Sequence, residues 1–314
     1  MAINSGEILF IKSVKDGIPN RDPLNDSDAR RLFPEEDGRI SLSDVSIKRD
    51  VRDFVVACYP GGGPQQRNHV FVQQIANDKG KLLGRGSLAG EIAKKAGKEK
   101  QAKEDMKEVL VEHCFDVRTF GIVYSVKPKF NLTGPVQFGW AHSLHPVDSH
   151  YVQGTVVMPS TEAGADTSEG DEAGKTQGTI WTSYIVPFAV FAMPAVINAK
   201  ASEFSGMSHE DQELLLRALW QGTQHRQARG RGIQQPLFLL HVEYKDPFYR
   251  IGYLEEMVRL PNRAPAGISD VELDVEEILK VLQDNAAKIS RVRVWTHPMV
   301  SVKGDTKQYL QQLW

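Results

Sequence analysis

The sequence predicts an α+β fold, in which an antiparallel sheet packs against helices and carries long insertions. Two observations predict this class. Short β-rich runs alternate with amphipathic helical stretches, and the 314 residues are 41% hydrophobic and 25% charged, as in ordinary globular domains. The longest apolar run, residues 184–197, contains two prolines and falls short of the roughly 20 residues that cross a bilayer. The chain is therefore expected to build a sizeable core of its own.

The first part of the chain is expected to supply a strand, a long loop and a helix. The apolar run at residues 7–14 predicts the strand, and residues 16–43, rich in Asp, Asn, Pro and Gly, predict the loop. Asp44 is expected to cap a helix over residues 45–59. Apolar residues of that stretch recur at helical spacing and are expected to face inward: Val45, Ile47, Val51, Phe54 and Val55.

The middle of the chain begins with a strong helix terminator. The run Pro-Gly-Gly-Gly-Pro at residues 60–64 ends the first helix, and residues 65–113 are mixed and largely helical towards their end. Two β-rich runs follow, at residues 115–125 and 136–144, and both are expected to be strands.

The second half of the chain completes the predicted order of elements. Residues 159–179 are small, acidic and rich in Gly and Ser, which is typical of a mobile insertion with little to bury. Strands are expected at residues 181–196, 236–244 and 292–295, and helices from Ser208 onward and over residues 270–285. The core order is then strand, helix, strand, strand, helix, strand. This is the ferredoxin-like split βαβ order, which RNA-recognition domains share.

Charge is unevenly distributed, although the formal net charge is only −2. Residues 47–103 hold twelve Lys/Arg against five Asp/Glu, residues 225–232 add three arginines and no acid, and residues 270–284 hold six acids and one lysine. A chain that segregates its charges can present a positive face to an anionic partner. Five lysines of the first segment fit either a binding face or a solvated helix face: Lys94, Lys95, Lys98, Lys100 and Lys103.

Cysteine and histidine content limits the kinds of site that the chain can form. Cys58 and Cys114 are too few for a disulfide framework or a four-thiolate zinc site, which favours a reducing cytoplasmic location. The N-terminus lacks the basic start and long apolar run of a signal peptide. Four possible zinc ligands cluster at a predicted strand end, where Pro146 and the alternation of a strand favour ordinary polar side chains: His142, His145, Asp148 and His150.

Six segments in a fixed order carry a resemblance to a known family. They are EILFIKSVKDGIPNRDPL (7–24), GRI with SDVSIKRDVRD (38–53), FDVRTFG (115–121), GPVQF (134–138), YIVPF with VINA (184–199), and LWQGT (219–223) before an arginine-rich turn. Together they resemble the Cas7 family, the repeated backbone subunit of type I CRISPR effector complexes (Cascade), with subtype I-B as the most similar branch. The resemblance covers about residues 5–297.

The resemblance implies a protein that is not an enzyme and needs no cofactor or metal. Its copies would form a helical filament along the spacer part of a CRISPR RNA, in contact with the large, small, repeat-handle-binding and RNA-processing subunits. Each copy would be a single domain over residues 1–314. An RNA-recognition-like palm with an antiparallel sheet would carry a helical finger insertion at residues 60–113 and a thumb loop at residues 150–182. The thumb would flip guide bases at intervals and leave the others free to pair with target DNA.

The chemistry of such a scaffold nominates RNA-contacting residues. Guide sequences vary, so the protein must bind phosphate and sugar rather than base edges. Lys48, Arg49 and Arg52 share the outer face of the first helix, where few acids lie nearby in sequence, and Ser43 and Ser46 can add neutral hydrogen bonds. Further candidates are Asn20 and Arg21 after the first strand, Arg118 and Gln137 in matching segments, Arg226, Arg229 and Arg231 in a glycine-rich turn, and Met158 as a wedge between bases.

Alternatives remain for some of these residues and for the function. Arg118 fits an RNA contact or a structural ion pair with Asp116, and Gln137 fits an RNA contact or a strand edge. The alternative function is a metal-dependent ribonuclease that cuts guide-paired target RNA, as related backbone subunits of type III complexes do. In that case Asp22 or Asp26 would hold Mg²⁺ near the scissile phosphate.

Overall fold

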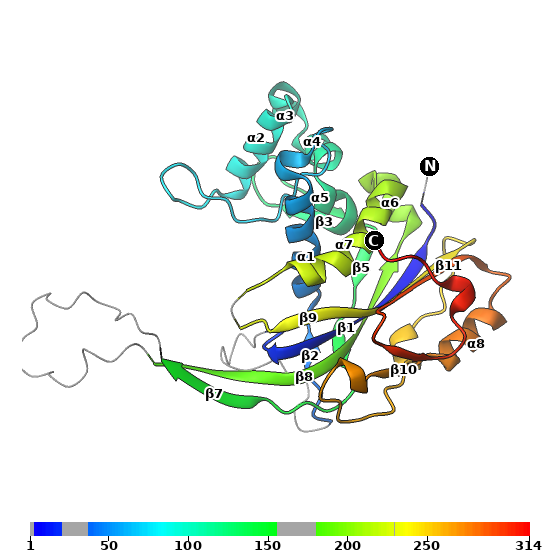
Figure 1. Cartoon of the computed structure of the whole chain (residues 1–314). Coiled ribbons are helices and arrows are strands. Elements are labelled where there is room, and N and C mark those ends of the chain that lie inside the picture. The colour runs from blue at the N-terminus through cyan, green and yellow to red at the C-terminus, as the bar shows by residue number, and fades with distance from the viewer. Residues whose placement is uncertain (1–2, 21–36, 156–179, 229) are drawn as a thin grey trace, which may run out of the picture.

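A computed structural model describes residues 3–20, 37–155, 180–228 and 230–314 of the chain (Figure 1). Its dominant feature is a sheet in which eight of the described strands take part. Four long strands form its centre, in the order β11-β9-β1-β8, and each pairs antiparallel with its neighbour. These strands are β1 (Gly6–Gly17), β8 (Ile180–Ile197), β9 (Ile233–Tyr244) and β11 (Ile289–Thr296).

Strand β1 lies between β8 and β9 and is covered on both faces. Alternate side chains of a strand point to opposite faces, so Ile8 and Phe10 belong to one hydrophobic core, and Leu9 and Ile11 belong to the other. This double burial explains why the segment is continuously apolar in sequence instead of alternating.

Helices α1 (Asp44–Cys58) and α7 (His209–His225) cover the first face of the sheet. A Cβ added at Gly222 of α7 would lie 2.7 Å from the carbonyl oxygen of Asp50 in α1, so the two helices approach this closely because the residue is glycine. Helix α7 begins with a reciprocal capping box, in which Ser208 and Asp211 satisfy each other's backbone N–H groups. The predicted start of this helix is confirmed.

The second face is covered by α8 (Glu276–Asp284) and by the 3₁₀ turn η2 (Leu254–Met257). Two short parallel strands, β10 (Glu272–Asp274) and β12 (Ser301–Lys303), lie beside α8 (Figure 1). The 3₁₀ turns η3 (Ile268–Asp270) and η4 (Lys307–Tyr309) also lie in this C-terminal region.

The 18-residue strand β8 is longer than its neighbour β1 and pairs with several short strands along its other edge. Its C-terminal part pairs with β5 (Val136–Phe138) and β6 (Ala141–Ser143), and β6 in turn pairs with β2 (Ser41–Leu42). Its N-terminal part pairs with β7 (His150–Thr155), and this two-stranded ribbon projects away from the sheet (Figure 1).

The segment after α1 builds a separate layer at the far end of that helix, away from the sheet (Figure 1). It has a hydrophobic core of its own, formed by residues such as Leu88, Ile92 and Leu110. Helix α6 (Ala199–Ser205) packs beside it. The elements of this layer are η1 (Pro60–Gly62), α2 (Arg85–Lys95), α3 (Glu99–Glu104), α4 (Met106–His113), α5 (Phe115–Phe120), β3 (Gly121–Tyr124) and β4 (Phe130–Thr133).

The central strands are confirmed, and four local expectations are wrong. Ser43 occupies the N-cap of α1, while Asp44 lies inside the helix. Val45 is 65% exposed, because it lies in the first turn beyond the edge of the core. The run 115–125 begins with helix α5, and the helix expected over 270–285 covers only Glu276–Asp284. The expected mobile insertion at 159–179 lies outside the described residues.

Candidate nucleic-acid interface

A cavity of about 410 Å³ lies where the C-terminal end of β1 meets the first turns of α1 and the turn after α7. We call it the α1 pocket. Seven of the residues expected to contact RNA line it, although they come from three separate parts of the chain: Asn20, Ser43, Ser46, Arg49, Arg52, Arg226 and Arg231. The structure therefore brings together residues that the sequence could only nominate one by one.

The turn at residues 226–232 is fastened to the end of β1. The backbone N–H of Ile18 donates to the carbonyl oxygen of Gly230 at 2.6 Å. Gly232 has φ +68°, and a Cβ there would lie 2.2 Å from the carbonyl oxygen of Lys15, so both the conformation and the close approach require glycine. The close approach of this turn to the end of β1 places Arg226 and Arg231 against α1.

One buried carboxylate holds three cations behind the pocket. Asp50 Oδ1 accepts from Arg226 at 2.8 Å and from Arg231 at 3.0 Å, and its Oδ2 accepts from Lys12 Nζ at 3.1 Å. Lys12 also donates to Gln234 Oε1 at 2.9 Å. We call Asp50, Lys12, Arg226 and Arg231 the Asp50 cluster. With three cations against one carboxylate, the cluster has a formal charge of +2.

Burial shapes the electrostatics of this cluster. Asp50 is fully buried and Lys12 is 2% exposed. Desolvation lowers the pKa of Lys12, while the Asp50 carboxylate opposes that shift. Desolvation also lowers the pKa of Arg231, again against the pull of Asp50. Positive charge is thus concentrated in a poorly solvated place, where an anion would interact with it strongly.

Two residues that line the pocket carry hydrogen-bond donors that are not satisfied by the described residues. Among the residues that the structure describes, Arg231 Nε and Asn20 Nδ2 are buried donors that find no hydrogen-bond partner. Their residues line the α1 pocket. Buried donors of this kind are costly unless an acceptor satisfies them, and a phosphate oxygen is such an acceptor.

The outer face of α1 is not a free row of cations. Each of its three cations has an ion-pair partner: Lys48 pairs with Asp44 at 2.8 Å, Arg49 with Asp53 at 2.6 Å, and Arg52 with Asp116 at 2.9 Å. The side chain of Arg49 is 45% exposed, whereas those of Lys48 and Arg52 are only 14% and 11% exposed. The expectation that few acids lie near these cations is wrong, and Arg49 is the most accessible of the three.

Arg118 is a structural residue, so its nomination as an RNA contact is corrected. It is 1% exposed. Its guanidinium forms a two-pronged pair with Asp211, at 2.9 and 2.7 Å, and also donates to three backbone carbonyls. The alternative prediction, a structural ion pair with Asp116, gave the correct role for Arg118 but the wrong partner. Asp116 instead accepts hydrogen bonds from Arg52 and from the backbone N–H groups of Phe71 and Val72.

The remaining candidates lie elsewhere. Gln137 donates to the carbonyl oxygen of Gly134 at 2.9 Å and lines a different cavity, between β5 and residues 250–255. Lys48 lies on α1 but does not line the pocket. Five residues named from the sequence lie outside the described residues: Arg21, Met158, Arg229, Asp22 and Asp26.

Sequence reasoning missed the buried half of the site. Lys12 interrupts the apolar run of β1, and Asp50 falls on the inward face of α1 among Ile47, Val51 and Phe54. A charged residue at a core position is rare unless it is paired. Two opposite charges at such positions were the available signal for a buried pair.

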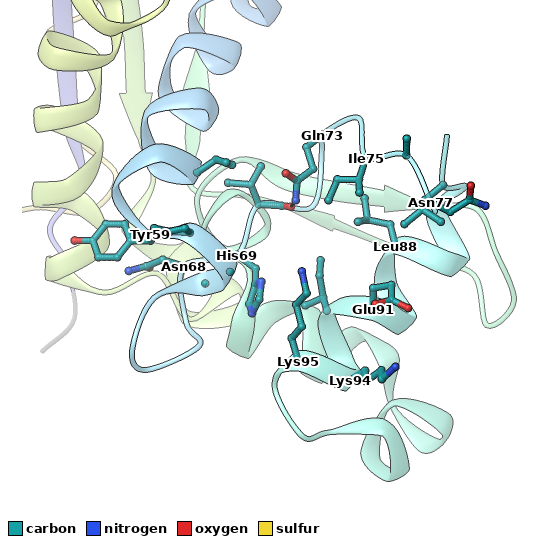
Figure 2. A pocket seen from close by; sticks show the side chains of 18 of the residues that line it. Tyr59, Asn68, His69, Gln73, Ile75, Asn77, Leu88, Glu91, Lys94 and Lys95 are labelled. Carbon is teal, nitrogen blue, oxygen red and sulfur yellow. Dashed lines mark hydrogen bonds between the residues drawn. The ribbon is translucent and has the colours of Figure 1, made fainter. Parts of the chain in front are cut away.

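Figure 2 shows another cavity, of about 530 Å³, between the end of α1, the following loop and α2. None of the residues named individually as RNA contacts lines it, but Lys94 and Lys95, which fit either a binding face or a solvated face, do. His69 and Lys95 face each other across it. The pKa of His69 is lowered to about 4, mainly by burial and to a lesser degree by the charges of Lys95 and His113. Its imidazole is therefore uncharged at neutral pH.

Replacing Lys95 by methionine is expected to raise the pKa of His69, because it removes a neighbouring positive charge while burial stays. An NMR titration of the imidazole resonances measures the pKa of His69. Lys94→Met is the matched control, since Lys94 lines the same cavity without perturbing His69. An unchanged pKa in Lys95→Met would mean that Lys95 does not act on His69.

The histidine-rich segment does not assemble into a ligand set. His142 Nδ1 bonds to Ser41 Oγ at 3.2 Å, and His145 Nδ1 bonds to the carbonyl oxygen of Pro146 at 2.8 Å. Within the described ranges, no group of three His, Cys, Asp or Glu residues is arranged to hold a metal ion. Among the same residues, no helix is both long enough and apolar enough to cross a membrane.

Known proteins provide an independent comparison. The sequence matches the family model of CRISPR-associated protein Cas7 over residues 4–276. The chain belongs to the Cas7 family. The matched range includes every residue that lines the α1 pocket. A curated relative, the CRISPR-associated protein Cas7 of Haloferax volcanii, is 23% identical over 315 residues, which span 93% of this chain and 86% of the relative.

Solved structures of similar fold agree with this membership in Cas7. A chain of a structure described as a CRISPR RNA-guided surveillance complex, pre-nicking, superposes with a TM-score of 0.56 at 13% identity, covering 96% of both chains. A chain of a second CRISPR RNA-guided surveillance complex superposes with a TM-score of 0.53 at 14% identity, covering 99% of this chain and 95% of the other. At such low identity, these matches establish a shared fold.

Proposed function

We propose that this Cas7 family member is a non-catalytic backbone subunit of a CRISPR Cascade complex, and that the α1 pocket binds backbone phosphates of the CRISPR RNA. The observation that carries the proposal is the +2 Asp50 cluster, which lies behind a cavity lined by seven polar or basic residues from three parts of the chain. A site that grips phosphate while ignoring base edges suits a guide of any sequence.

The remaining parts of the chain receive roles on the same proposal. The neighbouring strands β9-β1-β8-β6, with α1 and α7 on one face, are the RNA-recognition-like palm. The insertion at residues 60–113 is the finger, and the ribbon formed by β7 and the start of β8 is the base of the thumb at residues 150–182. Copies polymerise along the spacer and present guide bases to target DNA, in a cytoplasmic complex of subtype I-B with its large, small, repeat-handle-binding and RNA-processing subunits.

The test is a titration of the purified chain against a labelled CRISPR-type single-stranded RNA and against duplex DNA of matched sequence. It is run with Mg²⁺ at several salt concentrations, and both binding and cleavage are scored. We expect salt-sensitive binding to the RNA, weaker binding to the duplex, and intact RNA at the end. Absence of RNA binding contradicts the proposal, and cleaved RNA favours the metal-dependent ribonuclease with Asp22 or Asp26 at its centre.

Arg49→Gln is expected to weaken RNA binding and to reduce the slope of log affinity against log salt by about 0.7, the value for one phosphate contact on a single strand. Arg49 is the best single probe because it lines the pocket, is 45% exposed and, among the described residues, is held by a single i,i+4 ion pair, with Asp53. Lys200→Gln is the control, since it makes the same charge change in an exposed pair on α6, outside the pocket. Equal losses in both variants would mean that only net charge matters.

A further inference from the structure

Two of the four arginines that line the α1 pocket, Arg226 and Arg231, share one anchoring oxygen. Arg226 reaches Asp50 Oδ1 through one terminal nitrogen at 2.8 Å, and Arg231 reaches the same oxygen at 3.0 Å. The other oxygen of Asp50 faces Lys12, which does not line the pocket. Asp50 therefore stands between a supporting ammonium on the strand side and two guanidinium groups on the pocket side.

Without this carboxylate, the arrangement would be unfavourable. Three positive groups lie close together in a poorly solvated environment: both arginines lower the pKa of Lys12, and Arg226 lowers the pKa of Arg231. An exposed arginine has many rotamers, and fixing it at the moment of binding costs conformational entropy. Fixing it beforehand through a buried acceptor removes that cost from the binding step.

We propose that Asp50 is a positioning residue, which holds Arg226 and Arg231 in place beside the α1 pocket while it lowers the positive charge of the site. The inference rests on the proposed RNA binding and deepens it, because it names the group that organises the site without touching the RNA. Asp50 is fully buried and does not line the pocket, so its effect on RNA must pass through the arginines.

Removal of the Asp50 carboxylate has opposite expected effects on RNA affinity, depending on whether the site works by charge or by positioning. Asp50→Asn adds one positive charge to the site, so a site that works by charge alone would bind RNA more tightly and with a steeper salt dependence. A site that depends on positioning binds RNA more weakly despite the added charge. We expect at least a tenfold loss of RNA affinity, measured by titration with the labelled CRISPR-type single-stranded RNA.

Asp53→Asn is the matched control for the charge. Asp53 lies one helical turn from Asp50 on α1, and its side chain is 29% exposed and pairs with Arg49 at 2.6 Å and with Arg226 at 3.4 Å. The charge change is identical, but Arg226 and Arg231 keep their buried anchor. We expect Asp53→Asn to bind RNA at least as tightly as the wild-type chain. Tighter binding by Asp50→Asn, in parallel with Asp53→Asn, would overturn the proposal.

A second variant tests whether the loss of RNA affinity comes from lower stability instead of from lost positioning. Asp50→Asn leaves the buried Lys12 without its counter-charge, which lowers stability. The double variant Lys12→Met/Asp50→Asn removes that ammonium as well and restores the original net charge of the cluster. We expect it to fold and still bind RNA weakly. Wild-type affinity in the double variant would overturn the proposal, because the loss in the single variant would then come from instability.

A readout without RNA separates this inference from the proposed function. Arginine side-chain NMR signals of labelled protein report whether the Nε–H groups of Arg226 and Arg231 are ordered. We expect slowly exchanging, dispersed signals in the wild-type chain and averaged signals in the double variant, whether or not the wild-type chain binds RNA. If the wild-type chain fails to bind RNA, only the proposed function falls. If the arginine signals stay ordered without Asp50, the positioning role falls.

Discussion

Replacing Arg118 by alanine is expected to lower the free energy of unfolding by about 3–5 kcal/mol, the range for breaking a buried ion pair by removing one partner. Arg118 is 1% exposed and Asp211 is 3% exposed. The variant leaves the Asp211 carboxylate buried without its guanidinium partner. It also leaves the carbonyl oxygens of Arg67, Val111 and Glu112 without the donor that Arg118 supplies.

The structural reason for so large an effect is that Arg118 joins the layer after α1 to helix α7. Its own helix α5 follows directly on α4, which supplies two of the three carbonyls, and Asp211 lies in the first turn of α7. Asp211 is also the N3 residue of the capping box with Ser208, so its displacement would disturb the start of α7. The loss is therefore expected to be cooperative and to lower the urea midpoint of the whole chain.

The effect is expected to depend on pH. Burial alone would raise the pKa of Asp211, but the hydrogen bonds and charge of Arg118 outweigh it and hold that pKa below its ordinary value. The stabilisation is then fully present above the unfolded-state pKa, near 4, and is lost as the pH falls through the lower folded-state value. The difference between wild type and Arg118→Ala should narrow below about pH 4.

Urea denaturation of both proteins at neutral and acid pH measures this difference. Arg217→Ala is the matched control on α7, because Arg217 is exposed, donates a hydrogen bond to Gln221 at 2.7 Å and lies over the Phe54 ring. We expect it to lose less than about 1 kcal/mol. A loss of similar size in Arg118→Ala would show that the buried pair is replaceable by water.

The sheet was predictable because its signals are local. Residues 7–14, 181–196 and 236–244 read as strands, and all three strands form and pair in the centre of the sheet. Helix α5 was not predictable in this way. Its residues Phe-Asp-Val-Arg-Thr-Phe favour a strand by composition, yet the short helix is fixed by ion pairs of Asp116 and Arg118 with distant residues.

The sequence predicted many of the residues that line the α1 pocket, but it did not predict how accessible their side chains are. Asn20, the serines and the arginines of the α1 pocket were nominated by residue type and by family resemblance, and the fold brings them together. Whether a cation is free to bind RNA depends on partners far away in sequence. Arg52 pairs with an acid 64 residues away, and Arg118 with one 93 residues away. Counting acids nearby in the sequence misses such pairs.

Arg52 shows the consequence for mutagenesis, because its reversal to glutamate is expected to destabilise the chain by about 3–5 kcal/mol rather than to weaken RNA binding alone. Asp116 is 1% exposed and accepts from Arg52 at 2.9 Å and from the backbone N–H groups of Phe71 and Val72 at 2.8 and 3.0 Å. A glutamate at position 52 would place a second negative charge against this buried carboxylate.

Unfolding of Arg52→Glu is expected to begin locally. Asp116 connects α1, the loop at residues 71–72 and α5, so the layer that follows α1 should open before the sheet does. Hydrogen exchange measures this order: the amides of Phe71 and Val72 should lose protection in Arg52→Glu, while those of β1 keep it. Equal loss of protection in β1 would mean that the layer and the sheet unfold as one unit.

Arg49→Glu is the matched control on the same helix, because its partner Asp53 is 29% exposed and water can solvate the displaced charges. We expect it to lose less than about 1 kcal/mol of stability and to keep the exchange protection of Phe71 and Val72, while its RNA affinity falls. A triple reversal of Lys48, Arg49 and Arg52 would confound binding with folding. Arg49→Glu alone separates the two effects, since Arg49 is the most exposed cation of this face and its partner Asp53 is partly exposed.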